Sequence, residues 1–327
     1  MPGVTVDSSG TLYGTTEFGG ISSFQYCGGG CGTVFKVKSS GKESVLHSFT
    51  EPPTDGIMPQ AGVIRDSLGA LYGTTTLGGP HNAYGNPGEG TVFKIADGKE
   101  TLLYAFTGGS DGALPAAALL LRKGVFYGTT TFGGDGPCST VYGAGCGTVF
   151  KLKGATETVL YSFNNQSDGG FPASSLIADR AGNLYGTTTL GGDLNCSQTN
   201  ANPEQGKPAL LPVGNPPGCG TVFKISPGGH ETVLHTFQGK TDGAWPGELV
   251  MDSAGNLHGA TVFAGDPKCH CGIVFKVDTA GKFTVLHAFS GPDGSDPEGL
   301  IQYKGRLYGT AAFGGPGNYG LVFEVTP

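Results

Sequence analysis

Apolar and polar residues alternate in short runs along the whole chain, and turn residues separate these runs. The clearest stretch is 174–237, which holds four runs of strand length rich in Val, Thr, Tyr and Phe. They are Ser175–Asp179, Leu184–Thr189, Gly220–Ile225 and Glu231–Phe237. Segments rich in Gly, Pro and Asn bound each run, which is typical of β-strands joined by turns. No segment keeps a 3.6-residue apolar period, so the pattern predicts almost no helix.

The same order of runs occurs six times. The second run of each unit begins with Leu-Tyr-Gly-Thr or a close variant, at Leu12, Leu71, Phe126, Leu184, Leu257 and Leu307. Repetition at this length indicates a repeat architecture, and four antiparallel strands per unit are the blades of a β-propeller. We therefore predict an all-β fold, a six-bladed β-propeller, as one domain over residues 1–327. The repeat units span about 3–49, 61–106, 117–163, 174–237, 247–289 and 299–325.

We call the four strands of a unit a, b, c and d, with a innermost and d outermost. Units three and six connect a to b through Lys123-Gly124 and Lys304-Gly305, where Gly supplies the positive φ of a short hairpin turn. The other four units use Asp-x-x-Gly or a close variant, beginning at Asp7, Asp66, Asp179 and Asp252. Only five d runs occur, because the chain stops after the c run of the sixth unit. We predict a last blade without its outer strand, or a natural chain that extends upstream of Met1.

The 61 glycines and 21 prolines fall at fixed offsets between apolar runs, so they mark turns and not disorder. With a net charge of −7 and few charged residues, the chain lacks the basic surface of a nucleic-acid-binding protein. No run reaches the ~18 apolar residues of a membrane-spanning helix. Met1-Pro2-Gly3-Val4 lacks the regions of a signal peptide.

The repeat words resemble those of a known family. Asn-Leu-Tyr-Gly-Thr-Thr, Gly-Gly, Gly-Thr-Val-Phe-Lys and Val-Leu-His-x-Phe, with Asp-Gly-x-x-Pro between units, resemble the GloVer-type tandem-repeat proteins. The a–b portion at Val4–Tyr13 is also similar to NHL and gluconolactonase-like propellers. The resemblance implies a β-propeller in a secreted or surface-anchored bacterial protein, and it implies no defined reaction. The calcium ligands of lactonase-like propellers have no counterpart that we can place in this sequence.

All eight cysteines lie between strands b and c, and they are present in pairs or not at all in a given unit. Cys31, Cys146, Cys219 and Cys271 share one position before the c strand, and each has one companion upstream, Cys27, Cys138, Cys196 and Cys269. This pattern predicts the disulfides 27–31, 138–146, 196–219 and 269–271 and an oxidising compartment. Metal binding is the alternative at Cys269-His270-Cys271, but two thiolates per blade do not make a four-ligand zinc site.

The b–c and d–a loops of an up-and-down blade emerge on the same face, which is therefore the expected binding face. Its five Asp-Gly pairs either form an acidic ring for cations or sugar hydroxyls, or are turn chemistry, which we favour. They begin at Asp55, Asp111, Asp168, Asp242 and Asp293. The aromatic candidates for stacking on a sugar are Trp245, Tyr26 and Tyr142, although Met58, Leu114 and Phe171 at the position of Trp245 favour a packing role.

Histidines divide into two groups. His47, His235 and His287 share a d-strand position with Tyr104 and Tyr161, and His258 replaces a Tyr of the b strands. Exchange with Tyr favours packing with a polar tip over catalysis. The loop histidines His81 and His270 are the better functional candidates.

We therefore expect an extracellular or cell-surface module that binds a glycan or a protein through its loop face without catalysis. The alternative is an extracellular propeller enzyme, a hydrolase or lyase on a carbohydrate or lactone, that uses loop Asp and His residues. We expect a monomer with no cofactor, no metal and no nucleic-acid partner; calcium is possible, but no feature of the sequence supports it.

Overall fold

Six small antiparallel sheets account for nearly all the secondary structure of the chain in a computed structural model. The structure describes residues 3–21, 27–50, 52, 54–80, 87–140, 143–196 and 217–327. The described part contains no α-helix, only one short 3₁₀ turn at Pro316–Asn318. None of its helices has the length and apolar character needed to cross a membrane. The six sheets confirm the all-β prediction and the six-bladed β-propeller class.

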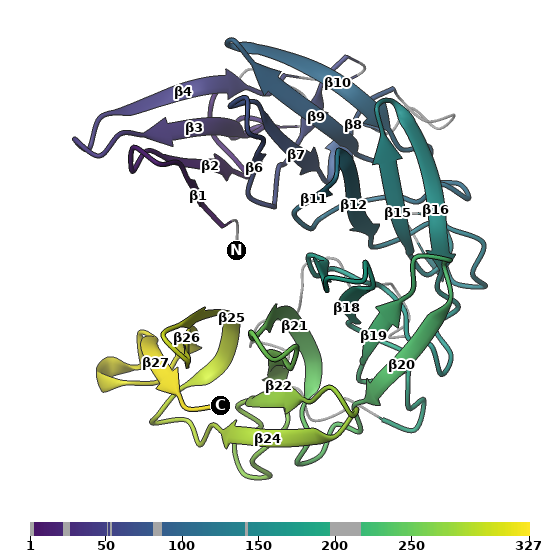
Figure 1. The fold of residues 1–327 in the computed structure, drawn as a ribbon, viewed down its shortest axis with the longest axis vertical. Helices are drawn as coiled ribbons and strands as arrows, with labels where there is room; N and C mark the ends of the chain where they lie inside the picture. Colours follow the sequence, from purple (N-terminus) through teal and green to yellow (C-terminus); the bar gives the residue numbers. More distant parts are fainter. Residues whose placement is uncertain are drawn as a thin grey trace. The chain divides into compact units, whose positions relative to one another are not determined.

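The strands form two compact units of three blades each. Figure 1 shows the blades of each unit following one another in chain order. In the first unit they are β1 (Thr5–Val6), β2 (Leu12–Thr16), β3 (Thr33–Val37) and β4 (Glu43–Ser48); β6 (Ile64–Arg65), β7 (Leu71–Thr75), β9 (Thr91–Ala96) and β10 (Lys99–Ala105); β11 (Leu120–Arg122), β12 (Val125–Thr130), β15 (Thr148–Lys153) and β16 (Thr156–Ser162). One short pair accompanies these blades, β5 (Gly56–Ile57) with β8 (Leu77–Gly78).

The second unit holds blades four to six. They are β17 (Ile177–Ala178), β18 (Leu184–Thr188), β19 (Thr221–Ile225) and β20 (Glu231–Thr236); β21 (Ala244–Met251), β22 (Leu257–Phe263), β23 (Ile273–Val277) and β24 (Phe283–Ala288); β25 (Ser295–Tyr303), β26 (Arg306–Phe313) and β27 (Leu321–Val325). The sixth sheet has only three strands, as predicted. The inner strands β21 and β25 are the longest of their kind, so blades five and six differ from the others at the start of strand a.

The repeat words encode the packing of each blade. The Gly of Leu-Tyr-Gly-Thr lies opposite the Phe of Gly-Thr-Val-Phe, as at Gly73 and Phe93. A Cβ atom on Gly73 would lie 2.6 Å from Cζ of Phe93, so only glycine lets the ring lie flat across the strand. The Phe that ends each outer strand then packs edge-on against this ring in the next blade, as Phe49 does on Phe93 at 5.1 Å. Each fully buried Phe adds about 2–3 kcal/mol of burial free energy.

The hairpins between strands a and b take the two forms expected from the sequence. Gly124 and Gly305 both have positive φ, as predicted. Lys123 and Lys304 also have positive φ, both 49°, although only the glycines were predicted to have it. Positive φ at both central residues is the signature of a type I′ turn, whose twist matches that of the flanking strands.

Candidate functional site

The aspartates of the Asp-x-x-Gly turns are tied to their own hairpins. Oδ1 of Asp66 accepts backbone hydrogen bonds from Leu68 and Ala70, and Oδ2 accepts one from the Tyr72 hydroxyl at 3.0 Å. Asp7 and Asp179 have the same arrangement with their own tyrosines. These carboxylates stabilise turns, and none of them has both oxygens open for a ligand.

His258 takes the place of the tyrosine in the fifth blade. It is completely buried, and its Nε2 lies 3.2 Å from Oδ2 of Asp252. Burial lowers the pKa of His258, although the bond to Asp252 acts in the opposite direction. Nδ1 has no hydrogen-bond partner among the described residues. This placement agrees with the packing role that exchange with Tyr predicts.

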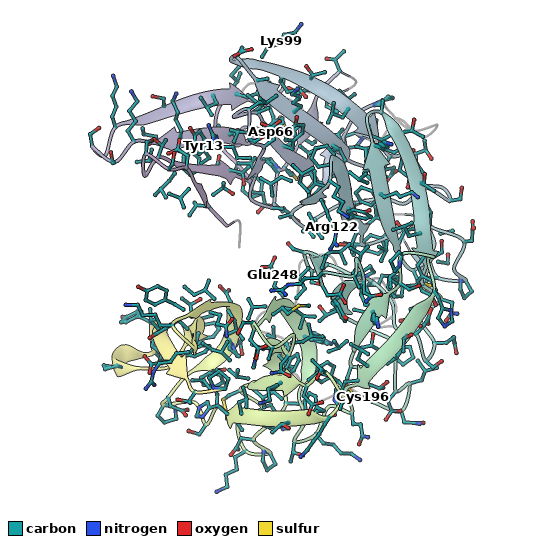
Figure 2. The ribbon with its side chains drawn as sticks, in the orientation of Figure 1. Tyr13, Asp66, Lys99, Arg122, Cys196 and Glu248 are labelled. Atoms are coloured by element: carbon teal, nitrogen blue, oxygen red, sulfur yellow. A yellow bond between two sulfur atoms is a disulfide. The ribbon has the colours of Figure 1, made fainter. Side chains whose placement is uncertain are left out.

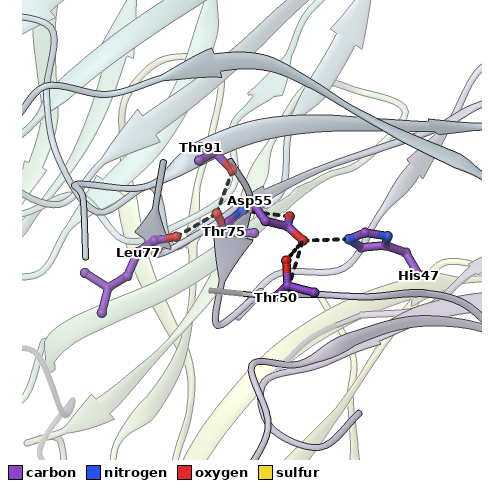
Figure 3. Close-up of polar contacts among 7 residues, drawn as sticks. His47, Thr50, Asp55, Thr75, Leu77 and Thr91 are labelled. Atoms are coloured by element: carbon purple, nitrogen blue, oxygen red, sulfur yellow. Dashed lines mark hydrogen bonds and ion pairs between the residues drawn. The ribbon is translucent and has the colours of Figure 1, made fainter. Parts of the chain in front are cut away.

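The aspartates of the d–a loops are a second repeated set, and Asp55 shows the pattern in Figure 3. Its Oδ2 accepts hydrogen bonds from the backbone N–H and the hydroxyl of Thr50, and Nε2 of His47 lies 3.1 Å away. Its Oδ1 accepts a bond from the backbone of Gly56. The side chain is 7% exposed, so this carboxylate is occupied by its own loop.

The other four d–a aspartates have the same kind of partners. Backbone N–H groups at Thr107, Asn164, Gln238 and Ser290 donate to Asp111, Asp168, Asp242 and Asp293, respectively. Outer-strand side chains add Tyr104 at 2.9 Å from Asp111 and His287 at 3.0 Å from Asp293. His235 lies 3.3 Å from Asp242 without the alignment of a hydrogen bond. The five aspartates are therefore local turn anchors, and the described residues contain no group of three metal-ligating side chains.

In four of the five cases a third residue, near the start of the next outer strand, faces the loop aspartate or its histidine. Burial raises the pKa of Glu100 to about 7, and the Asp55 carboxylate raises it further. Glu157 beside Asp111 and Glu231 beside Asp168 have pKa values raised to about 7 for the same two reasons. In the fifth blade the position is Phe283, whose ring stacks on that of His235 with centroids 3.7 Å apart. The His or Tyr of one outer strand, the aspartate of the d–a loop and a residue of the next outer strand thus lie together. We call this group the junction between two blades.

Trp245 is buried in this structure. Its side chain is 4% exposed and packs edge-on against Phe263, with ring centroids 4.6 Å apart. Its backbone has a φ of 58°, and Met58, Leu114 and Phe171 have nearly the same value at the equivalent position. Nε1 of Trp245 has no hydrogen-bond partner among the described residues. The aromatic face is therefore covered, while one buried donor is left unpaired.

The same position in the sixth blade is Asp296, which was not among the residues predicted from the sequence. It is 5% exposed and has the same left-handed backbone, with a φ of 53°. Oδ1 accepts a hydrogen bond from the Ser295 hydroxyl, whereas Oδ2 has no partner in the described part of the chain. Burial raises its pKa, and nearby Glu298 adds to the effect. The available signal was a carboxylate in Asp293-Gly294-Ser295-Asp296-Pro297 where the other blades have an apolar residue.

The fifth b–c loop lies beside Asp296. The backbone N–H of Asp296 donates to the carbonyl of Cys271 at 3.2 Å, and His270 precedes this cysteine. His270 is half-buried with a φ of 54°, and the disulfide between Cys269 and Cys271 closes the loop around it. Of the other candidates, Tyr26, Tyr142 and His81 lie outside the described residues.

The structure contains no free cysteine. Disulfides join Cys27 to Cys31, Cys196 to Cys219, and Cys269 to Cys271. Cys138 and Cys146 are also disulfide-bonded, and the other six cysteines pair among themselves. Each bridge therefore closes one b–c loop within its own blade. Figure 2 labels Cys196 among the side chains of the second unit.

A model of the Gloeobacter/Verrucomicrobia repeat matches residues 2–142 and 212–327 of this sequence. The two matched segments together make up more than half of the chain. The repeated motifs of this sequence, such as Leu-Tyr-Gly-Thr and Gly-Thr-Val-Phe, therefore belong to a defined repeat family. No match was found among curated proteins.

Solved propellers resemble the chain in fold. Regucalcin from Agrobacterium tumefaciens, a calcium-binding protein, is 16% identical with a TM-score of 0.51, over 99% of this chain and 88% of that one. A luciferin-regenerating enzyme is 13% identical with a TM-score of 0.50, over 100% of this chain and 91% of that one. A gluconolactonase from Xanthomonas campestris is 15% identical with a TM-score of 0.47, over 98% and 83%. At such identities the likeness of the first two supports the fold alone.

Proposed function

We propose that this chain, which belongs to the Gloeobacter/Verrucomicrobia repeat family, is an extracellular or cell-surface binding module that takes a glycan on its loop face without catalysis. Four disulfides support an oxidising compartment, because such bonds persist mainly outside the cytosol. The fold allows many functions, so the proposal depends on particular side chains.

The observation that carries it is a pair of unpaired buried polar atoms on neighbouring inner strands. Trp245 on β21 offers an N–H donor, and Asp296 on β25 offers a carboxylate acceptor. A buried polar atom without a partner costs about 1–3 kcal/mol, and a bound group that pairs with it recovers this cost. A sugar hydroxyl donates and accepts at the same oxygen, so a polyhydroxylated ligand suits both atoms. Trp245 and Asp296 stand at the same repeat position, which holds an apolar side chain in each of the first three d–a loops.

The repeated His–Asp pairs do not favour catalysis. His47, His235 and His287 contact loop aspartates in the same position from which Tyr104 contacts Asp111. A tyrosine holds a carboxylate as well as a histidine does, but it is a poor general base near neutral pH. Exchange between the two residue types therefore supports a structural role for these pairs.

A second candidate is the propeller enzyme, a hydrolase or lyase on a carbohydrate or lactone. Asp296 favours it, since burial raises the pKa of this carboxyl, and a raised pKa suits a carboxyl for general acid–base catalysis. His270 is the nearby titratable loop residue that would accept a proton, because its neighbour Cys271 contacts the backbone of Asp296. The two candidates use the same side chain and differ in whether a product is formed.

A glycan array probed with the native protein tests the proposal. Asp296→Leu and Trp245→Phe introduce residues that Leu114 and Phe171 show to be compatible with this backbone, so both variants are expected to fold. We expect glycan binding by the native chain and a loss of about tenfold or more in each variant, because both remove one polar contact. Glu43→Gln, an exposed outer-strand residue of the first blade, is the control and should bind normally.

Absence of any glycan bound by the native chain, or equal binding by Asp296→Leu, overturns the proposal. Incubation of each protein with a panel of glycosides and lactones separates the two candidates. Turnover that is lost in Asp296→Leu and in His270→Ala identifies an enzyme.

A further inference from the structure

The disulfide of the fifth blade closes a loop of a single residue, His270. Cys269 and Cys271 are two positions apart, whereas the bridges at Cys27–Cys31 and Cys196–Cys219 span 4 and 23 positions. In the loop-closure account, the stability that a disulfide adds grows with the length of the loop it closes. This bridge therefore stabilises the fold less, in this way, than the other bridges do.

Hydrogen bonds that do not involve sulfur hold both ends of this loop. The carboxylate of Asp266 accepts a bond from the backbone N–H of Lys268 at 2.7 Å, and its carbonyl accepts one from the N–H of His270 at 2.9 Å. On the other side, the backbone N–H of Asp296 donates to the carbonyl of Cys271 at 3.2 Å. The two cysteines therefore stay near each other when the S–S bond is broken, and this proximity favours a bond that opens and closes reversibly.

The d–a loop lies closer to the disulfide of the fourth blade than to that of the fifth. A Cβ atom on Gly239 would lie 2.7 Å from Sγ of Cys219 and closer still to Sγ of Cys196. The equivalent residue of the next d–a loop is Gly291, and there the nearest sulfur, Sγ of Cys271, is 3.8 Å from the Cβ position. The backbone of this loop therefore covers the fourth-blade sulfurs and leaves more room at those of the fifth blade.

The backbone and the charges of this loop both favour an S–S bond that can be reduced. His270 has a φ of 54°, a left-handed conformation that costs a non-glycine residue free energy, and breaking the ring lets it relax. Lys268 is exposed and directly precedes Cys269, so its ammonium group stabilises a thiolate there. The carboxylate of Asp266 opposes this effect, but its Oδ1 is bonded to the backbone N–H groups of Lys268 and Cys269.

We propose that Cys269 and Cys271 form a thiol–disulfide exchange site that oxidises a dithiol substrate, an activity separate from the proposed glycan binding. A substrate thiolate attacks Sγ of Cys269, which is half-buried, whereas Cys271 is 4% exposed. The S–S bond breaks, and its electron pair leaves with Sγ of Cys271. The second substrate thiolate then attacks the substrate sulfur of the mixed disulfide and displaces Cys269. The substrate leaves as a disulfide, oxidised by two electrons, and its two protons end on the two cysteine thiols.

Equilibration of the intact chain with mixtures of reduced and oxidised glutathione tests the site. Free thiols are trapped with iodoacetamide and located by peptide mass spectrometry. Structural disulfides resist glutathione, so we expect the equilibrium constant for reduction of Cys269 and Cys271 to exceed that of every other pair by about tenfold or more. Cys138 provides the most stringent comparison, because it is also half-buried but lies farther from its partner Cys146. The far-ultraviolet circular dichroism should stay unchanged while the fifth-blade pair is reduced.

Oxidation of a substrate provides a second readout. With air excluded, one equivalent of a peptide with two cysteine thiols should become its disulfide about tenfold faster with the native chain than with the Cys269→Ser, Cys271→Ser variant. The matched control is Cys27→Ser with Cys31→Ser, which removes another short-loop bridge and should oxidise the peptide as the native chain does. Equal reduction of all four pairs by glutathione overturns the proposal. Loss of the dichroism signal as Cys269 and Cys271 are reduced, or equal oxidation by native chain and Cys269→Ser, Cys271→Ser variant, also overturns it.

Discussion

The half-buried glutamates Glu100, Glu157 and Glu231 should make the fold less stable as pH rises through neutrality. Each carboxyl has an ordinary pKa of 4.5 that is raised to about 7 in the folded chain, by burial first and by a loop aspartate second. The Oε1 atom of each glutamate is buried and has no hydrogen-bond partner among the described residues. The folded state therefore holds these protons more tightly than the unfolded state does.

The direction and size of the effect follow from proton linkage. Between pH 4.5 and about 7 the folded chain binds more protons than the unfolded chain, so the free energy of unfolding falls as pH rises. Below pH 4.5 both states are protonated, and above about pH 7 the penalty is complete. The full change in pKa sets an upper bound of ~3 kcal/mol per group. Because solvent screens these half-buried side chains, about 1 kcal/mol each is the realistic figure.

The triple substitution Glu100→Gln, Glu157→Gln and Glu231→Gln removes the charges and keeps the shape. Urea unfolding followed by circular dichroism, with disulfides intact, should show the triple variant more stable than the native chain by about 3 kcal/mol at pH 8. At pH 4.5 the two proteins should be nearly equal. Glu43→Gln is the matched control, because Glu43 has the same strand position but is exposed. A triple variant that gains no more at pH 8 than this control would refute the reasoning.

Three further substitutions test other parts of the structure. Gly186→Ala should cost about 2–4 kcal/mol in urea unfolding, since its Cβ would lie 2.7 Å from Phe223, whereas Gly299→Ala, with no atom nearby, should be neutral. Asp296→Leu should stabilise the chain by about 1–3 kcal/mol at pH 8, as seen in thermal unfolding, because it removes an unpaired buried carboxylate; an unchanged melting temperature would show that this carboxylate is already paired. Burial lowers the pKa of His258, so below pH 6.5 the unfolded chain binds a proton that the folded chain does not, and acid destabilises the fold. His258→Tyr should remove this loss of stability. An equal change in the free energy of unfolding between pH 7.5 and pH 5 in the native and variant chains would contradict this.

Much of the fold could be predicted from the sequence because the determinants are local and repeated. The Gly of Leu-Tyr-Gly-Thr faces the Phe of the next strand, so these two words set the register of strands b and c. Exchange between Tyr and His within one repeat position predicted packing with a polar tip, and in the structure this tip contacts an aspartate. The missing sixth outer strand followed from counting the runs.

The junctions between blades could not be predicted in the same way. Glu100 lies in the second repeat unit and Asp55 in the loop that leads into this unit, and their approach depends on how one blade packs on the next. A single sequence holds no signal for that distance. Trp245 had apolar equivalents that indicated burial, but the unpaired Nε1 became evident only with coordinates. Alignment of the repeat units does identify Asp296, because it is the one carboxylate at a position that is otherwise apolar or aromatic.

The departures from the repeat are concentrated between blades five and six, and most of them weaken an interaction that other blades have. Ile273 replaces the threonine that bonds across the b–c pair elsewhere, as Thr221 does with Thr188 at 2.9 Å. Asp296 replaces the apolar residue that the other d–a loops have at this position. Four other blades pair or pack the residue at each of these two positions, so stability alone gives no reason for the departures. Local violations of this kind are expected where a fold is used for function, so this junction is the place to test first.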